Sequence, residues 1–105
     1  MSTFVLLTKM SREGMGDLSK LESVEREWLQ EVKNTCPEVR WRDHYALFGP
    51  YDFLDIYEAP NEETAAKVSM ISMSLGAAKA ETWTALPYKE FLEVAKDFGK
   101  TAAAA

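Results

Sequence analysis

The spacing of apolar residues predicts a β-strand close to the start of the chain. Residues 3–10 open with an unbroken apolar run from Phe4 to Leu7. Successive side chains of a strand point to opposite faces, so Phe4 and Leu6 face one way while Val5 and Leu7 face the other. The pattern therefore predicts a strand that is buried on both of its faces.

Three longer segments carry apolar residues at the spacing of an amphipathic helix. Residues 17–36 begin at an aspartate suited to an N-cap and end before a proline. Residues 61–75 begin at an asparagine and are followed by Gly76, which suits a helix C-cap. Residues 87–98 begin at a proline and end before Gly99. The predicted inner face of this last helix consists of Tyr88, Phe91, Leu92, Ala95 and Phe98.

Three further segments have the composition of strands. Residues 38–48 alternate between apolar and polar side chains, residues 51–58 are rich in aromatic and branched ones, and residues 81–85 supply a fourth strand. The order is βαββαβ followed by a helix. It predicts an α+β protein with a ferredoxin-like fold and a four-stranded antiparallel sheet. The first and third strands are expected at the centre, with the first two helices on one face.

The doubly apolar first strand has a consequence for assembly. Two helices cover one face of the predicted sheet, so the other face needs a cover. The last helix is a single short element, and a second copy of the sheet is the simpler cover. The sequence therefore predicts a homodimer through the sheet face, with a higher oligomer left open.

Composition limits the classes of protein to which the chain can belong. Its 105 residues suit one domain, expected over residues 1–98, with a low-complexity tail at 99–105. The net charge of −5 argues against nucleic acid or an anionic membrane as partner. One cysteine and one histidine predict no disulfide and no metal site, and no cofactor is expected. With no long apolar segment, a cytoplasmic protein is expected.

One segment resembles a known family. Residues 47–66 place Gly49, Tyr51 and Asp52 in a Gly-x-Tyr-Asp arrangement, followed by Ala-Pro-Asn-Glu-Glu at the predicted start of a helix. This run resembles the GYD domain family. Two more segments resemble its first and last strands: residues 4–8 and residues 81–87. The resemblance implies a dimeric α+β barrel. It implies no single activity, since related barrels include cofactor-independent monooxygenases, isomerases, stress-response proteins and haem proteins.

The hairpin between the second and third strands carries the candidate site. Leu54 and Ile56 are expected to face the helices, and an even loop would place Trp41 and Tyr45 on their face. The opposite, dimer-facing surface would then collect a histidine, charged groups and aromatic residues. These are Arg42, His44, Ala46, Tyr51, Phe53, Asp55 and Tyr57.

The length of the hairpin loop decides which residue lies opposite His44. A loop of residues 49–50 places His44 across from Asp55, and a loop of residues 50–51 places it across from Tyr57. An odd loop would exchange the faces. Asp52, beside the turn, is expected to satisfy backbone groups.

Each candidate residue has a role that its chemistry suggests. His44 has an unperturbed pKa near neutrality and is the candidate general base. Asp55 could orient it, which makes these two the candidate catalytic pair. Arg42, Tyr51, Phe53 and Tyr57 are candidate ligand-binding residues. Because residues 38–48 are expected to form an edge strand, a structural role for this histidine is favoured over the catalytic one.

Three functions fit these residues. The first is binding of a small apolar or aromatic metabolite between sheet faces, because a chain this short has little material for a cavity of its own. The second is a cofactor-independent oxygenase or isomerase-like enzyme that uses His44 as base. The third is a structural or regulatory dimerisation module without a ligand. The sequence does not decide among them and does not identify a ligand.

Overall fold

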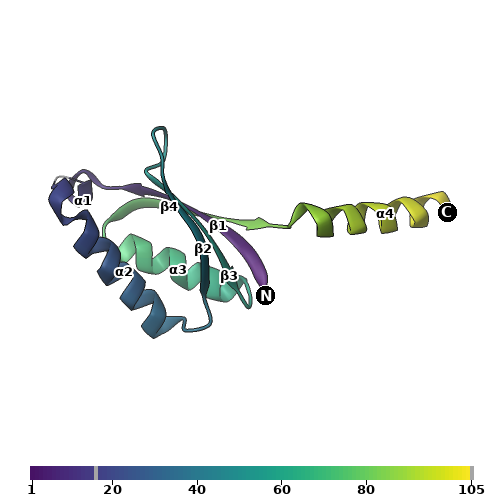
Figure 1. Cartoon of the computed structure of the whole chain (residues 1–105), viewed down its shortest axis with the longest axis horizontal. Coiled ribbons are helices and arrows are strands. Elements are labelled where there is room, and N and C mark those ends of the chain that lie inside the picture. Colours follow the sequence, from purple (N-terminus) through teal and green to yellow (C-terminus); the bar gives the residue numbers. More distant parts are fainter. Residues whose placement is uncertain (16, 105) are drawn as a thin grey trace.

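The computed structural model describes residues 1–15 and 17–104, apart from the side chains of residues 14, 15 and 102–104. Its strands and helices follow the predicted order (Figure 1). A short helix and a 3-10 turn, η1, precede the first long helix. The elements are β1 Ser2–Met10, α1 Arg12–Met15, η1 Leu18–Lys20, α2 Leu21–Thr35, β2 Arg40–Ala46, β3 Phe53–Ala59, α3 Glu62–Ser74, β4 Ala77–Ala85 and α4 Tyr88–Ala104.

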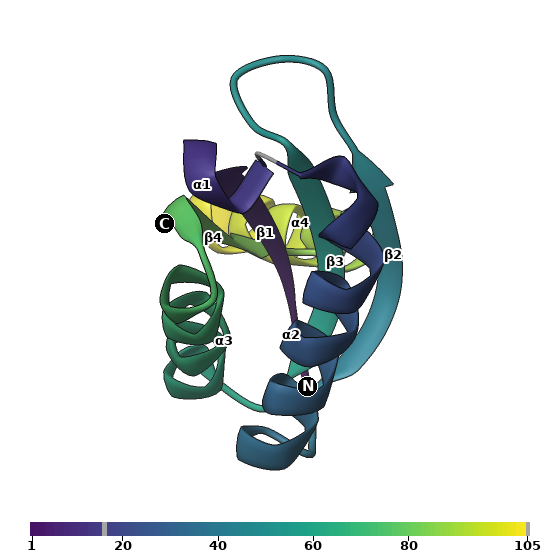
Figure 2. The same ribbon diagram turned by 90° about the vertical axis from the view of Figure 1, so that its left-hand side faces the viewer.

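The four strands form one antiparallel sheet in the order β2-β3-β1-β4. Helices α2 and α3 lie side by side on one face of it (Figure 2). The predicted ferredoxin-like α+β fold, with the first and third strands at the centre, is therefore confirmed.

Local signals fix several ends of these elements. The Asp17 side chain accepts a hydrogen bond from the Ser19 backbone N–H at the start of η1. Asn61 caps α3 by accepting from the Thr64 backbone N–H at 2.9 Å. Gly76 follows α3 with a φ of 112°, a left-handed conformation that glycine adopts without strain. Residues 12–15 form the short helix α1 between β1 and η1.

The core lies between the sheet and the two helices. Its largest fully buried side chains are Phe4, Leu6, Val32, Tyr57 and Val68. The Tyr57 ring packs against Phe4, with centroids 5.7 Å apart, and burial of these side chains is the main force that holds the two layers together.

The faces of β3 are the reverse of the prediction. Leu54 pairs with Leu7 and Ile56 with Val5, on the sheet face away from the helices. Asp55 and Tyr57 point to the helices, where both are buried. The prediction assumed that the aliphatic pair must be the inward one. The structure buries a carboxyl group inward because a neighbouring strand provides its hydrogen-bond partner.

An irregularity in β2 explains a second difference. Trp41 lies opposite Tyr57, but Asp43, two residues later, lies opposite the next residue, Ile56. The extra residue, Arg42, is a β-bulge, and a bulge moves the flanking side chains to new faces. Trp41 therefore shares the covered face with His44 instead of lying beside Leu54 and Ile56.

Helix α4 departs from the prediction most strongly. It projects away from the sheet and covers neither face (Figure 1). Its expected inner face, including Tyr88, Phe91 and Phe98, is exposed in the single chain. The helix also continues through Gly99 to Ala104, where the prediction ended it. The open sheet face therefore stays uncovered within one chain.

Candidate functional site

A cavity of about 280 Å³ opens between α2 and the covered face of the sheet. Its walls are mainly apolar and come from the sheet and from helices α2 and α3. The main apolar lining consists of Met10, Leu21, Val24, Trp28, Phe53 and Leu75. The sequence led us to expect a pocket between sheet faces, whereas this cavity lies within one chain, between α2 and the sheet.

Three ionisable side chains meet at the rim of this cavity. His44 Nδ1 lies 2.5 Å from Oδ1 of Asp55, and His44 Nε2 lies 3.4 Å from Oε1 of Glu25. His44 and Asp55 are direct cross-strand partners, so the sheet register fixes their contact. Glu25 comes from the opposite layer, on α2. We call Glu25, His44 and Asp55 the rim triad.

The members of the rim triad differ in their access to water. The side chain of Asp55 is only 5% exposed, whereas those of His44 and Glu25 are 43% and 45% exposed. Burial raises the pKa of the Asp55 carboxyl to about 6, and the charge and hydrogen bond of His44 oppose that rise in part. Because the carboxylate accepts from Nδ1, the Nε2 atom is the histidine nitrogen turned toward Glu25 and solvent.

Aromatic rings hold the imidazole and one cavity wall in place. The Phe53 ring stacks on His44 with centroids 5.8 Å apart. The Trp28 indole N–H donates to Ser72 Oγ at 2.8 Å, and that hydroxyl donates to the Val68 carbonyl. Trp28 therefore ties α2 to α3 while its ring lines the cavity. Such locked rotamers give the cavity a defined shape without a ligand.

The structure separates the candidate residues that the sequence placed on one face. His44, Asp55 and Phe53 come together at the cavity. Tyr57 shares their face but is fully buried, with its ring 5.2 Å from that of Trp41, and does not line the cavity. This face lies under the helices and not at the predicted sheet-to-sheet interface.

Arg42 and Tyr51 lie apart from the main cavity. The Arg42 guanidinium donates to Glu58 Oε2 at 2.6 Å, and Arg42 lines a second, smaller hollow that the rim triad also borders. Tyr51 lies in the hairpin loop, where the Lys79 ammonium is 5.7 Å from the centre of its ring. The bulge at Arg42 and the loop at Tyr51 break the strict alternation on which the prediction depended.

Two residues of α2 contribute to the site and were not predicted to do so. Glu25 and Trp28 line the cavity, and neither was among the candidate site residues. A signal for Glu25 was present, because its spacing from Leu21 and Trp28 puts it on the apolar stripe of the helix. A carboxylate on such a stripe is expected to have a partner, which here is His44.

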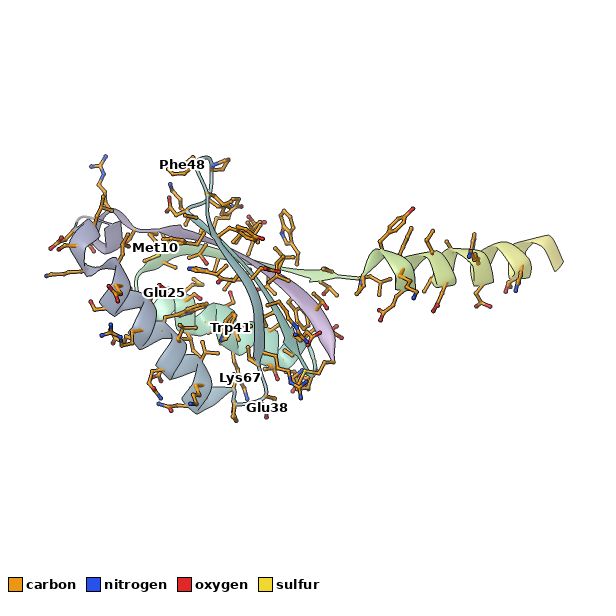
Figure 3. All side chains as sticks on the ribbon, in the orientation of Figure 1. Met10, Glu25, Glu38, Trp41, Phe48 and Lys67 are labelled. Carbon is orange, nitrogen blue, oxygen red and sulfur yellow. The ribbon has the colours of Figure 1, made fainter. Side chains whose placement is uncertain are left out.

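The motif residue Asp52 has a structural role. Its Oδ2 accepts from the Met10 backbone N–H at 2.8 Å, and its own N–H donates to the Thr8 carbonyl. Lys9 adds an ion pair at 3.5 Å. Asp52 thus fastens the hairpin loop to β1, whereas Phe48 stands fully exposed at the hairpin tip (Figure 3).

Two other kinds of feature are absent from the described residues. Among residues 1–15 and 17–104, no group of three or more histidine, cysteine, aspartate or glutamate side chains could hold a metal ion. Across the part of the chain that the structure describes, no helix is long and apolar enough to cross a membrane.

Comparison with models of known families identifies the family of this chain. The model of the GYD domain matches residues 4–95. The chain belongs to the GYD domain family. The match spans β1 to the middle of α4, so it includes every residue of the rim triad.

A relative agrees with this assignment, and two solved structures agree with the fold. A Thermus thermophilus protein named "Glutamine synthetase and cystathionine beta-lyase binding protein" is 32% identical over 92 residues, which are 88% of this chain and 96% of that protein. The crystal structure of FFRP-DM1 aligns with 82% of this chain and with 100% of the FFRP-DM1 chain, at 19% identity and a TM-score of 0.54. The crystal structure of the Thermus thermophilus protein TTHA0845 aligns with 83% of this chain and with 95% of the TTHA0845 chain, at 22% identity and a TM-score of 0.50. These two structures are evidence for the fold alone.

Proposed function

We propose that this protein binds a small, mainly apolar or aromatic molecule in the cavity between α2 and the sheet. The observation that carries the proposal is the combination of an apolar cavity of about 280 Å³ with the rim triad at its mouth. Small-ligand sites combine apolar walls with a few convergent polar groups in this way. The proposed ligand therefore lies inside one chain rather than between two sheets.

A substitution that fills the cavity tests this proposal. Val24→Phe adds a ring to the wall formed by α2, whereas Met70→Phe adds the same ring at an exposed position of α3. A library of small aromatic compounds would be followed by amide chemical shifts. We expect shifts around Thr8 and Phe53 in the wild type and in Met70→Phe, and their loss in Val24→Phe. Compounds that shift only residues elsewhere, or that still bind Val24→Phe equally well, would contradict the proposal.

A second candidate function is an enzyme that uses His44 as base. The observation in its favour is the buried Asp55 at Nδ1, which leaves Nε2 as the basic nitrogen at the cavity mouth. This enzyme would act, without a cofactor, as an oxygenase or isomerase on a phenolic or enolisable substrate. For any substrate found, His44→Ala should lower kcat by about a hundredfold or more. Unchanged turnover would remove His44 from the mechanism.

We also propose that the open face of the sheet forms a homodimer. This face carries Val5, Leu7, Tyr45, Leu54, Ile56 and Trp83, and none of the described helices covers it. Tyr45 and Trp83 are each 53% exposed in the single chain. An exposed aromatic and aliphatic patch of this kind is typical of a protein interface.

A third candidate function is regulation through protein partners. The name of the Thermus relative supports it, since that protein is named for binding two enzymes. The exposed apolar residues of α4, including Phe91 and Phe98, offer a surface for such a partner. Titration with purified glutamine synthetase and cystathionine beta-lyase tests this candidate, and binding that survives Phe91→Ser with Phe98→Ser would exclude α4 as the surface.

A further inference from the structure

The rim triad has a charge that limits which ligands the cavity accepts. Two carboxyl groups and one imidazole meet there, and with a single shared proton on His44 or Asp55 their net charge is −1. Glu22 also lines the cavity, but its carboxylate is paired with Arg26, so the excess negative charge at the rim comes from the rim triad. A ligand with a carboxylate or phosphate at this end would be repelled.

No basic side chain offsets this charge inside the cavity. None of the described residues that line it is a lysine or an arginine. Arg26 on α2 and Arg42 in β2 have acidic partners: Arg26 pairs with Glu22 at 3.5 Å, and Arg42 pairs with Glu58 at 2.6 Å. Positive charge at the rim would therefore have to come from a bound molecule.

The walls of the cavity favour the same kind of ligand. The rings of Trp28 and Phe53 both line it, and aromatic faces attract organic cations in partly desolvated sites. The aliphatic lining of Leu21, Val24 and Leu75 would hold an apolar body. A dry cavity of roughly 150 Å³ holds benzene, so a cavity of about 280 Å³ has room for one ring with a short side chain.

We propose that the ligand of this cavity is an organic amine with an apolar body, whose protonated amino group binds at Glu25. The proposal deepens the function above and depends on it. Glu25 is the suitable carboxylate because it is half-exposed and contacts His44 only at 3.4 Å, so an ammonium group can replace that contact. Asp55 is already held at 2.5 Å by His44 and is closed to solvent.

Three probes with the same ring test the proposal on the full chain. These are 2-phenylethylamine, 2-phenylethanol and 3-phenylpropionate, titrated at neutral pH by calorimetry and by amide chemical shifts. We expect the amine to bind at least about tenfold more tightly than the carboxylate, with the alcohol between them. We also expect the shifts to map to the cavity walls.

Paired variants of α2 separate the charge effect from a general loss of structure. Glu25→Gln should weaken binding of the amine at least about threefold and leave the alcohol unchanged. Glu27→Gln, an exposed position of the same helix, is the matched control and should change neither. Preserved melting temperatures would show that both variants are folded.

The possible failures are distinguishable. If the carboxylate binds as tightly as the amine, or if Glu25→Gln leaves the affinity for the amine unchanged, the amine proposal is wrong while the cavity remains a ligand site. If none of the three probes binds at up to about 10 mM, both the amine proposal and the ligand-binding function are overturned.

Discussion

Asp55 combines deep burial with a neighbour that can be charged. Burial disfavours its ionised form, so the pKa of the carboxyl rises from 3.8 to about 6. The groups that face it from other elements are His44 on β2 and Glu25 on α2. Replacing a carboxyl by an amide removes the buried charge and keeps a hydrogen-bond acceptor for the imidazole.

The raised pKa predicts how Asp55→Asn changes stability with pH. Between about pH 4 and pH 6 the folded protein holds the Asp55 proton and the unfolded chain releases it, so this group lowers the free energy of unfolding as the pH rises. Asp55→Asn should therefore gain stability relative to the wild type, by at most about 3 kcal/mol, between pH 4 and pH 7. The measurement is urea unfolding of both proteins across this pH range. The prediction is contradicted if the difference in their free energies of unfolding does not change with pH, or changes in the opposite direction.

Tyr57 gives a second prediction at the residue scale. Its hydroxyl is buried and has no hydrogen-bond partner among the described residues, and burial raises the pKa of its phenol. Tyr57→Phe removes an unsatisfied polar group and keeps the ring packing on Phe4 and Trp41. We expect the free energy of unfolding to stay equal or rise by about 1 kcal/mol. A loss of more than about 1 kcal/mol in urea unfolding would indicate a bound water or partner at the hydroxyl.

At the scale of elements, Asp52 joins the hairpin loop to the central strand β1. Asp52→Ala leaves the Met10 N–H without its charged acceptor and removes the ion pair with Lys9. We expect a loss of about 1.5 to 3 kcal/mol in the free energy of unfolding. Asp52→Asn, which keeps an acceptor oxygen, should recover part of it. Asp43→Ala, on exposed β2, should change stability by less than about 0.5 kcal/mol, and an equal loss there would refute the specific role of Asp52.

The β2–β3 hairpin shows where prediction from sequence succeeds and where it fails at this scale. A loop of even length offered either Asp55 or Tyr57 as the residue opposite His44, and the structure has Asp55 there. The bulge at Arg42 has no signal in the local pattern, so the faces of Trp41 and Arg42 could not be derived. The prediction of which β3 face points to the helices failed for a different reason. Both faces of β3 are apolar enough to be buried, and only the position of the helices decides between them.

At the scale of the whole molecule, one uncovered sheet face and one projecting helix remain unexplained within a single chain. The molecule measures 59 × 30 × 18 Å, a long shape for 105 residues, because α4 extends beyond the body (Figure 1). Apolar residues line both the uncovered face and α4. The proposed homodimer would remove the sheet patch from water.

The homodimer gives a prediction at this scale. Trp83 lies opposite Val5 on the uncovered face, so Trp83→Glu puts a charge into the proposed interface. We expect the dimer dissociation constant to rise at least about thirtyfold, measured by light scattering after size exclusion. Phe48→Glu at the exposed hairpin tip is the matched control and should leave the dimer intact. A wild-type protein that is monomeric at micromolar concentration would contradict the interface.

The sequence by itself determined the order of strands and helices and the ferredoxin-like fold, and it offered Asp55 as one of two cross-strand partners for His44. These follow from short-range periodicity, caps and turn residues, which act between neighbours in the chain. The tertiary structure decided which sheet face the helices cover, and it brought Glu25 and Trp28 from α2 to the hairpin residues. It therefore moved the candidate site from an expected dimer interface to a cavity inside one chain. The reason is physical: a strand with two apolar faces satisfies the same local pattern in either orientation, and only the packing of distant helices makes the two orientations different in energy.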